Sequence, residues 1–419
     1  MLFKFLLVFS ILIILLAACS PISAGSAKND ATLAAVSATK FVEATQTATL
    51  MSTETPEEEE SYILDQIKMF DEKNGWLVAG REDGPMYLFH TTDGGLSWAD
   101  VTPPGISDIT PGFFFLDAQT AWLPSSTPDT NVPTIFHTSD AGKSWEQYGH
   151  LPFKQAVLHF TNPSFGWATA DGGSNMNHDY FTLYQSLDGG IHWTQLLFAK
   201  NLGLASDAPT LPVGTFQVAN GQNFYFLDPS TIWFGGNQLE AQDHVILQLS
   251  RDAGQTWSQK TIEVPGTDQL ADKTVIFGTP LFLSEKDGYI VASYSVPEHD
   301  GLSAQAVSDV MMTHDGGNTW IASPNLVKGE SYSSLHIDFI SSTDAFFHCG
   351  DSLCRTLDGA QTWTSIRSNF DFTPINDHYP LLDLDFVNAQ VGWAIIHQDS
   401  QYQLIKTNDG GVTWTMLHP

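Results

Sequence analysis

The sequence has very little positive charge. Its 419 residues include 17 lysines and arginines against 47 aspartates and glutamates, which gives a formal net charge of −30. This excess repels phosphate backbones and argues against nucleic acid as a partner. The only arginines are Arg81, Arg251, Arg355 and Arg367. They are scattered along the chain, so we do not expect a site that needs several convergent arginines.

No apolar run is long enough for a permanent membrane-spanning helix. The run from Phe5 to Leu16 has about twelve residues, whereas a span needs about twenty. It follows Lys4 and leads into Ala17, Ala18 and Cys19, which resembles the lipobox of bacterial lipoproteins. We therefore predict an exported protein held on the outer side of a membrane by a lipid on Cys19. A plain secretory peptide is the alternative.

The segment after Cys19 shows no apolar periodicity. Residues 20–60 are rich in Ala, Ser and Thr and end in four consecutive glutamates. Because this composition cannot bury a core, we predict a flexible tether. The predicted parts are a lipoprotein signal peptide at 1–18, the lipidated cysteine and disordered tether at 19–60, and one folded domain at 61–419.

Cysteine is scarce as well. The chain has three cysteines, so Cys349 and Cys354 remain if Cys19 is lipidated. We place them in the second and third strands of the sixth repeat, on either side of a tight turn. In an oxidising compartment such a close pair favours a disulfide. Two free buried thiols are the alternative.

An eight-residue string occurs seven times and dominates the rest of the chain. The first copy, at 91–98, reads Thr-Thr-Asp-Gly-Gly-Leu-Ser-Trp, and the others begin at residues 138, 186, 250, 313, 356 and 407. The string resembles the BNR or Asp-box motif, Ser/Thr-x-Asp-x-Gly-x-Thr/Ser-Trp, with His192 and Ala360 as departures. The box aspartates are Asp93, Asp140, Asp188, Asp252, Asp315, Asp358 and Asp409, and the box tryptophans are Trp98, Trp145, Trp193, Trp257, Trp320, Trp363 and Trp414.

The chemistry of the box is that of a hairpin turn. The Asp carboxylate can accept hydrogen bonds from backbone N–H groups of its own turn, and the Gly allows a positive φ. The Trp then enters the next strand and packs inward. We predict that the box aspartates are structural. At Ala360 we predict either a less favourable backbone conformation or a rearranged turn.

A second pattern precedes each box. An apolar residue, usually Phe, is followed two positions later by Asp, Asn or Ser, and five positions after that by an aromatic residue. These residues, here called the strand aromatics, are Trp76, Trp122, Trp167, Trp233, Tyr289, Phe346 and Trp393. The two patterns account for all twelve tryptophans, so none is left for a dedicated ligand platform.

The spacing of the boxes predicts the fold. Successive boxes lie 43 to 64 residues apart, and a four-stranded propeller blade takes about 40 to 50 residues. We predict an all-β, seven-bladed β-propeller of four-stranded antiparallel blades over 61–419, with the first-blade strands at 62–69, 75–79, 86–91 and 97–101. The ring is expected to close by packing of blade against blade, and a strand contributed by the tether is the alternative. A linear solenoid is the alternative.

The long, variable segments fall on one face of this ring. The boxes lie between third and fourth strands, whereas the long segments, at 125–133, 171–179, 200–222, 261–274, 297–306 and 367–380, lie on the opposite face. Any binding site is therefore expected there. Recurrent His-acid pairs on these segments could ligate a divalent metal, although solvated polar loops are the alternative. They are His178 and Asp179, Asp243 and His244, Glu298, His299 and Asp300, and Asp377 and His378.

The boxes and the pairs Gly75-Trp76, Gly166-Trp167 and Gly392-Trp393 resemble the Ycf48/Hcf136-like propellers. That resemblance covers residues 61–419 and implies an exported or thylakoid-lumenal propeller that helps to assemble photosystem II. Members of that family carry an arginine-rich patch for their partner, which four scattered arginines cannot form. We therefore expect a non-photosynthetic relative.

Asp boxes also occur in sialidases, which clamp the substrate carboxylate with an arginine triad. This chain has no Arg-Ile-Pro motif, and Arg251 lies inside a box. We predict a monomeric binding or scaffold module for a protein or glycan partner, with no cofactor apart from the metal considered above, rather than an enzyme. A glycan hydrolase that uses two carboxylates of the long-segment face is the alternative.

Overall fold

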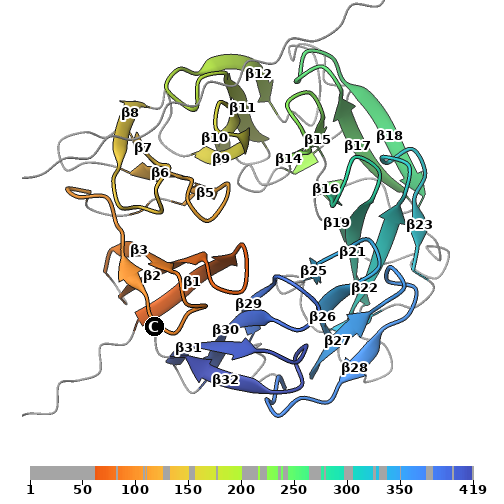
Figure 1. Cartoon of the computed structure of the whole chain (residues 1–419). Coiled ribbons are helices and arrows are strands. Elements are labelled where there is room, and N and C mark those ends of the chain that lie inside the picture. Colours follow the sequence, from red (N-terminus) through yellow and green to blue (C-terminus); the bar gives the residue numbers. More distant parts are fainter. Residues whose placement is uncertain are drawn as a thin grey trace, which may run out of the picture. The chain divides into compact units, whose positions relative to one another are not determined.

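The computed structural model shows seven antiparallel sheets arranged in a ring (Figure 1). It describes residues 62–417 except 82–83, 107–108, 110, 126–132, 151–155, 176–177, 201–215, 218–223, 235–236, 239–243, 264–274, 278–279, 297–304, 324–326, 330–336, 350, 374–380 and 399–400. All described strands belong to one compact unit, Glu58–Pro419. The predicted signal peptide, Cys19 and the tether lie outside the described residues.

Each blade is a meander in which consecutive strands pair, with the first strand nearest the ring axis (Figure 1). Blade 1 has β1 (Tyr62–Met69), β2 (Gly75–Arg81), β3 (Met86–Thr91) and β4 (Ala99–Asp100). Blade 2 has β5 (Phe114–Phe115), β6 (Ala121–Ser125), β7 (Thr134–Thr138) and β8 (Glu146–His150). Blade 3 has β9 (Ala156–Asn162), β10 (Phe165–Asn175), β11 (His178–Ser186) and β12 (Thr194–Lys200). Blade 4 has β14 (Phe224–Phe226), β15 (Ile232–Phe234), β17 (His244–Ser250) and β18 (Ser258–Glu263).

Blades 6 and 7 repeat this order, whereas blade 5 departs from it. Blade 6 has β25 (Ile337–Phe339), β26 (Ala345–Cys349), β27 (Ser352–Thr356) and β28 (Thr364–Ile366), and blade 7 has β29 (Leu381–Phe386), β30 (Gly392–Gln398), β31 (Gln401–Thr407) and β32 (Trp414–Leu417). In blade 5, β19 (Val275–Phe277) and β20 (Leu281–Phe282) both pair with β21 (Gly288–Val296), and β23 (Ile321–Ala322) and β24 (Val327–Gly329) both pair with β22 (Gln305–Thr313). An extra pair joins β13 (Phe216–Gln217) to β16 (Asn237–Gln238).

The predicted fold is confirmed. The first three strands of blade 1 begin where the sequence places them, and the fourth is shorter than predicted because only Ala99 and Asp100 pair with β3. Antiparallel neighbours with short turns arise wherever two β-rich runs flank a Gly-containing turn, which this sequence repeats in every blade. Among the described residues, no helix is long and apolar enough to cross a bilayer.

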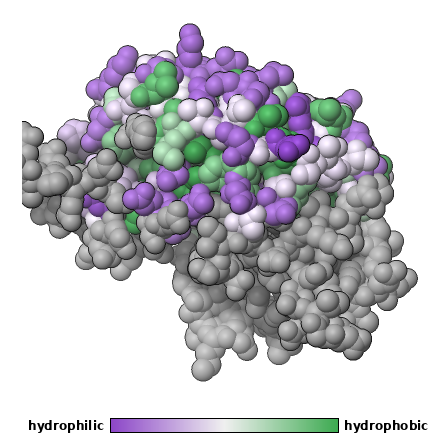
Figure 2. All heavy atoms as spheres, turned by 90° about the horizontal axis from the view of Figure 1, so that it is seen from below, coloured by the Kyte–Doolittle hydropathy of each residue, from purple (hydrophilic) through white to green (hydrophobic). Residues whose placement is uncertain are grey.

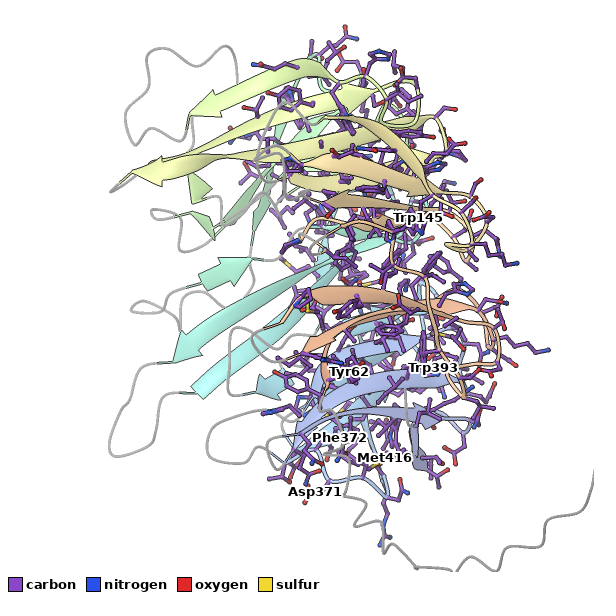
Figure 3. All side chains as sticks on the ribbon, turned by 90° about the vertical axis from the view of Figure 1, so that its left-hand side faces the viewer. Tyr62, Trp145, Asp371, Phe372, Trp393 and Met416 are labelled. Atoms are coloured by element: carbon purple, nitrogen blue, oxygen red, sulfur yellow. A yellow bond between two sulfur atoms is a disulfide. The ribbon has the colours of Figure 1, made fainter. Side chains whose placement is uncertain are left out.

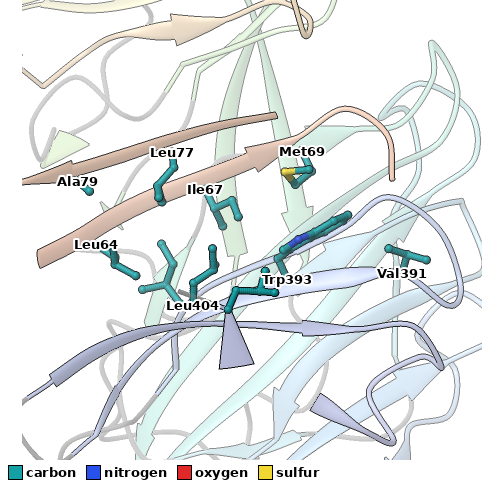
Figure 4. Close-up of a cluster of buried hydrophobic side chains, with 10 residues drawn as sticks. Leu64, Ile67, Met69, Leu77, Ala79, Val391, Trp393 and Leu404 are labelled. Atoms are coloured by element: carbon teal, nitrogen blue, oxygen red, sulfur yellow. The ribbon is translucent and has the colours of Figure 1, made fainter. Parts of the chain in front are cut away.

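The hydrophobic core lies mainly between the blades. The five tryptophans among the strand aromatics are each at most 1% exposed. At the junction of blades 1 and 7, Leu64, Ile67 and Met69 of β1 pack against Trp393 of β30 and Leu404 of β31 (Figure 4). Since burial of apolar area drives folding, this packing of sheet on sheet holds the ring together.

Among the described strands, blades 7 and 1 exchange none. All four strands of each blade are consecutive in the chain, so the ring closes by packing of complete blades, as predicted. The closure, here called the seam, is also bridged by hydrogen bonds. Trp393 Nε1 donates to Gly94 O at 3.0 Å, and Lys406 Nζ donates to the same oxygen at 3.1 Å while lying over the Trp393 ring.

Candidate functional site

Each box carboxylate is engaged inside its own turn. In blade 1, Asp93 Oδ1 accepts from Thr91 Oγ1 and from Ser97 N, both at 2.9 Å, and Asp93 Oδ2 accepts from the Ser97 hydroxyl at 2.6 Å. Thr91 Oγ1 in turn accepts from Gly95 N at 2.9 Å. The other six boxes repeat this network, with His192 Nδ1 in place of a hydroxyl beside Asp188.

The electrostatics of the boxes agree with a structural role. Hydrogen bonds from the Ser144 side chain and backbone lower the pKa of Asp140 to about 2. Bonds from Thr319 do the same for Asp315, whose pKa is also about 2. The carboxylates therefore stay ionised and bonded to their own turns at any physiological pH.

The box turns require left-handed backbone at two successive positions. Ala360 has φ of 65°, so the predicted unfavourable conformation is confirmed. Ala141 and Ala253, at the preceding box position, have φ of 63° and 58°, which the sequence analysis missed. An L-residue pays about 1–2 kcal/mol for this conformation, so the hydrogen-bond network of the turn must hold it in place.

One face of the ring, here called the box face, carries the boxes and the first-to-second-strand connections. In blade 1, Gly94 N donates to Lys73 O at 2.9 Å, and every other blade has the equivalent bond. The remaining connections lie on the opposite face. Figure 3 shows β10–β11 and β21–β22 extending toward that face, away from the box turns.

Exposed apolar side chains on the box face are isolated. They occupy the unspecified positions of the boxes, as in Leu96, Leu187 and Leu357, each at least 66% exposed. Figure 2 shows hydrophobic residues scattered among hydrophilic ones over the described surface. Single exposed apolar residues are normal for soluble domains and do not make a binding patch.

The proposed metal ligands are only partly within the described residues. His178 and Asp179 begin β11, where they pair with Asn175 and Ser174, and His244 begins β17. Asp243, Glu298, His299, Asp300, Asp377 and His378 lie outside the described residues. In the part of the chain that the structure describes, no three His, Cys, Asp or Glu side chains form a group that could hold a metal ion.

The innermost strands carry a set of residues that the sequence analysis missed. The residue just before the leading Phe or Met of each blade, here called the inner residue, occupies the same position on every first strand. The inner residues are Lys68, Phe114, His159, Tyr225, Leu281, Asp338 and Asp385. Four of them form hydrogen bonds with the backbone of the leading residue in the next blade.

The inner bonds differ in chemistry around the ring. His159 Nε2 lies 3.1 Å from Phe226 O, and the Tyr225 hydroxyl donates to Phe282 O at 2.6 Å. Asp338 instead accepts from Phe386 N, and Asp385 accepts from Met69 N. Carbonyl acceptors therefore serve blades 3 to 5, whereas carboxylate acceptors serve blades 6, 7 and 1.

Acidic groups gather where blades 6, 7 and 1 meet. Besides its bond to Met69 N, Asp385 pairs with Lys68 Nζ at 2.6 Å, and Asp383 Oδ2 accepts from Ile67 N at 3.0 Å. Burial raises the pKa of Asp338 to about 7, with a further contribution from the Asp385 charge, and raises that of Asp383 to about 6. Burial alone would lower the pKa of Lys68, but the charge and hydrogen bond of Asp385, together with the charges of Asp338 and Asp383, outweigh it and raise the pKa.

A sequence signal for this acidic cluster does exist. The strand Leu-Leu-Asp-Leu-Asp-Phe at 381–386 places two aspartates between apolar residues in the core of a blade. Buried carboxylates need partners, so such a pattern predicts a specific set of donors. What the sequence does not show is which donors the neighbouring blades supply.

Cys349 and Cys354 lie on β26 and β27, the second and third strands of blade 6. They are joined by a disulfide, and their Cα atoms are 5.8 Å apart. The adjacent His348 is buried, and its Nε2 lies 3.4 Å from Phe372 O. The cross-link closes the end of this hairpin on the side opposite the boxes.

No protein-family model and no curated protein matches this chain. Among solved structures, it is similar to YCF48 bound to a D1 peptide (16% identity, 86% of this chain and 93% of that chain, TM-score 0.45).

Two further solved structures are also similar to this chain. One is the β-propeller domain of the Trilobed protease from Pyrococcus furiosus (8% identity, 86% and 98% of the chains, TM-score 0.47). The other is the GH93 alpha-L-arabinofuranosidase of Fusarium graminearum with arabinobiose (12% identity, 71% and 90%, TM-score 0.39). The likeness is one of β-propeller architecture, which hosts binding proteins and enzymes alike.

Proposed function

We propose that this chain is an exported, lipid-anchored β-propeller that binds a protein or glycan partner through the face opposite the boxes. The lipid on Cys19 would hold it at the outer side of a membrane, and residues 20–60 would let the ring reach its partner. In this proposal the ring is a scaffold, and the longer connections supply recognition.

This proposal rests on a difference between the two faces of the ring. On the box face, all seven box carboxylates are bonded within their own turns, so these groups are not free to bind a ligand. On the opposite face, β10–β11 and β21–β22 are longer than the strands of the other blades. Binding residues commonly lie on the variable segments that a rigid scaffold presents.

The two ends of β11 provide a matched test of the face. A photo-crosslinking amino acid at His178 would report on the opposite face, and one at Leu187, which is 66% exposed beside the same strand, would report on the box face. We expect cross-linked partner in cells only from position 178. Equal yields from both positions, or adducts from position 187 alone, would contradict the proposed face.

The anchor is tested separately. Cys19→Ser should abolish incorporation of radiolabelled fatty acid and release the protein from the membrane fraction. A Cys19→Ser protein that stays with membranes as fully as the wild type would refute lipid anchoring without bearing on the binding face.

A glycan-cleaving activity is the second candidate, and the acidic cluster favours it. A general acid in glycoside hydrolysis needs a raised pKa, and the pKa values of Asp338 and Asp383 are raised to about 7 and 6. Both carboxylates already accept backbone N–H groups of neighbouring strands, which fits a structural role better. Release of reducing sugar from a polysaccharide panel by the wild type, lost in Asp338→Asn, would favour the enzyme.

A further inference from the structure

The seam differs from the other blade junctions in its covalent structure. Successive blades from 1 to 7 are joined by the chain, but blades 7 and 1 contain the last and first described strands. Contacts between blade 1 and blade 7 must therefore hold the ring closed. They include the apolar cluster in Figure 4, the bonds to Gly94 O described above, and the polar bonds that Ile67, Lys68 and Met69 form with β29.

Two of the carboxylates at the junctions of blades 6, 7 and 1 can titrate near neutral pH, whereas His159 and Tyr225 at the junctions of blades 3, 4 and 5 do not. At the junctions of blades 3, 4 and 5, the bonding groups are His159 and Tyr225. Burial lowers the pKa of His159 to about 4 and raises the pKa of Tyr225, so both stay neutral from about pH 5 to pH 9. At the junctions of blades 6, 7 and 1, the bonding groups are carboxylates.

The charges around Asp338 do not balance when Asp338, Asp383 and Asp385 are all ionised. Asp383 and Asp385 face it from β29, Lys68 faces it from β1, and the buried Tyr289 of β21 interacts with it electrostatically. Burial is the main cause that raises the pKa of Tyr289, so this phenol stays neutral. Three carboxylates then share one ammonium group in a partly buried junction, where uncompensated charge is costly.

We propose that the junction of blades 6, 7 and 1 is a pH-sensitive closure, in which protonation of Asp338 and Asp383 tightens the ring and deprotonation loosens it at the seam. In the protonated junction, Lys68 and Asp385 form a neutral pair, and the two neutral carboxyl groups still accept the N–H groups of Phe386 and Ile67. On deprotonation these N–H bonds persist, but two negative charges are added beside Asp385.

The direction of the pH dependence follows from proton linkage. The pKa of Asp338 rises from 3.8 to about 7 on folding, and that of Asp383 rises to about 6. Between the unfolded and folded values the folded protein holds more protons, so the free energy of unfolding falls as pH rises from about 4 to about 7. Lys68 titrates above this window and does not alter the sign.

Thermal melting of three proteins between about pH 5 and pH 8 tests the closure. Asp338→Asn removes the titrating group but keeps an oxygen that can accept from Phe386 N–H. Glu285→Gln makes the analogous acid-to-amide substitution at an exposed site and controls for removal of one acidic residue from a chain with a net charge of −30. We expect the melting temperature of the wild type and of Glu285→Gln to fall with pH more steeply than that of Asp338→Asn. Equal slopes for all three would overturn the proposal.

Hydrogen exchange of the wild type gives a second test that needs no variant. The amides of Ile67 and Phe386 bond to the titrating carboxylates Asp383 and Asp338, whereas Leu158 N bonds to Gly112 O between blades 2 and 3 at 3.0 Å. After correction for intrinsic exchange, protection at Ile67 and Phe386 should decrease with pH relative to Leu158. Parallel behaviour of the three amides would mean that the seam does not open in response to pH.

Discussion

The two tryptophans of blade 4 meet different surroundings. Trp233, a strand aromatic, is 1% exposed and packs against Leu249, Phe282 and Met311 in the junction with blade 5. Trp257, the box tryptophan, is only partly buried and packs against Phe224 in the junction with blade 3. The motif that is easiest to find in the sequence therefore does not mark the deepest part of the core, and the less regular strand position does.

The largest expected effect comes from exchanging these two tryptophans for alanine. Trp233→Ala should lower the free energy of unfolding by about 3–5 kcal/mol, because it leaves a large cavity between two blades. The sequence alone predicts the same loss for Trp257→Ala, but its partial exposure reduces the expected loss to about half. Urea unfolding of both variants measures the difference. Equal losses would mean that exposure does not distinguish the two positions.

The strand aromatic of one blade also restricts the box of the next. A Cβ on Gly317 would lie 2.4 Å from the Trp233 ring, and a Cβ on Gly95 would lie 3.4 Å from Trp393 Nε1. Blade 5 has the smaller Tyr289 at this position, and the next box has Ala360, which shares a core cluster with it. The smaller ring of Tyr289 therefore leaves room for the methyl group of Ala360, where other boxes have glycine.

A double-mutant cycle tests this coupling. Tyr289→Trp should cost about 1–3 kcal/mol by overpacking against Ala360. Ala360→Gly should recover most of that loss, because it removes the obstructing methyl group and relieves the positive φ. Stability is measured by urea unfolding of the single and double variants. Additive effects would show that the two positions are independent.

The disulfide stands in the blade whose strand aromatic is Phe346 instead of Trp or Tyr. Reduction of Cys349–Cys354 should lower the free energy of unfolding by about 2 kcal/mol, since the closed loop is short. Intact mass after alkylation, with and without reductant, establishes the redox state, and melting of both forms gives the effect. Complete alkylation without reductant would show that the thiols are free in the purified protein.

The smallest effect is expected on the face opposite the boxes. Alanine at Glu298, His299 and Asp300 together should leave the melting temperature nearly unchanged, because substitutions away from packed or capped positions usually change stability by less than about 0.5 kcal/mol. If the triple variant were strongly destabilised and Trp257→Ala were harmless, the assignment of the boxes to stability and of the opposite face to binding would be wrong. Metal analysis of the wild type after dialysis against Ca²⁺ or Zn²⁺ tests the metal hypothesis at the same time.

Local patterns were sufficient to predict most of the fold. Turn chemistry predicts the strands of blade 1, and the number of boxes predicts the number of blades, since each hairpin depends on its own residues. The acidic cluster could not be assembled in this way, because Lys68 and Asp385 come together only when the two ends of the repeat array meet. The partial exposure of six of the box tryptophans could not be predicted, because the sequence does not show how much of each side chain the neighbouring blade covers, and only Trp414 is buried.

Because each described blade is built from consecutive strands, the seven blades could form in the same way if the chain began between any two of them. Tyr62 begins a complete blade, and Leu417 ends the blade beside it. A circular permutant that links these ends and starts between two other blades would keep all seven hairpin sets, at the modest entropic cost of one more loop. In the native chain, the junction that lacks a covalent connection is also the one beside the buried carboxylates. In the permutant, the unconnected junction would lie elsewhere, while the carboxylates stayed between blades 6, 7 and 1.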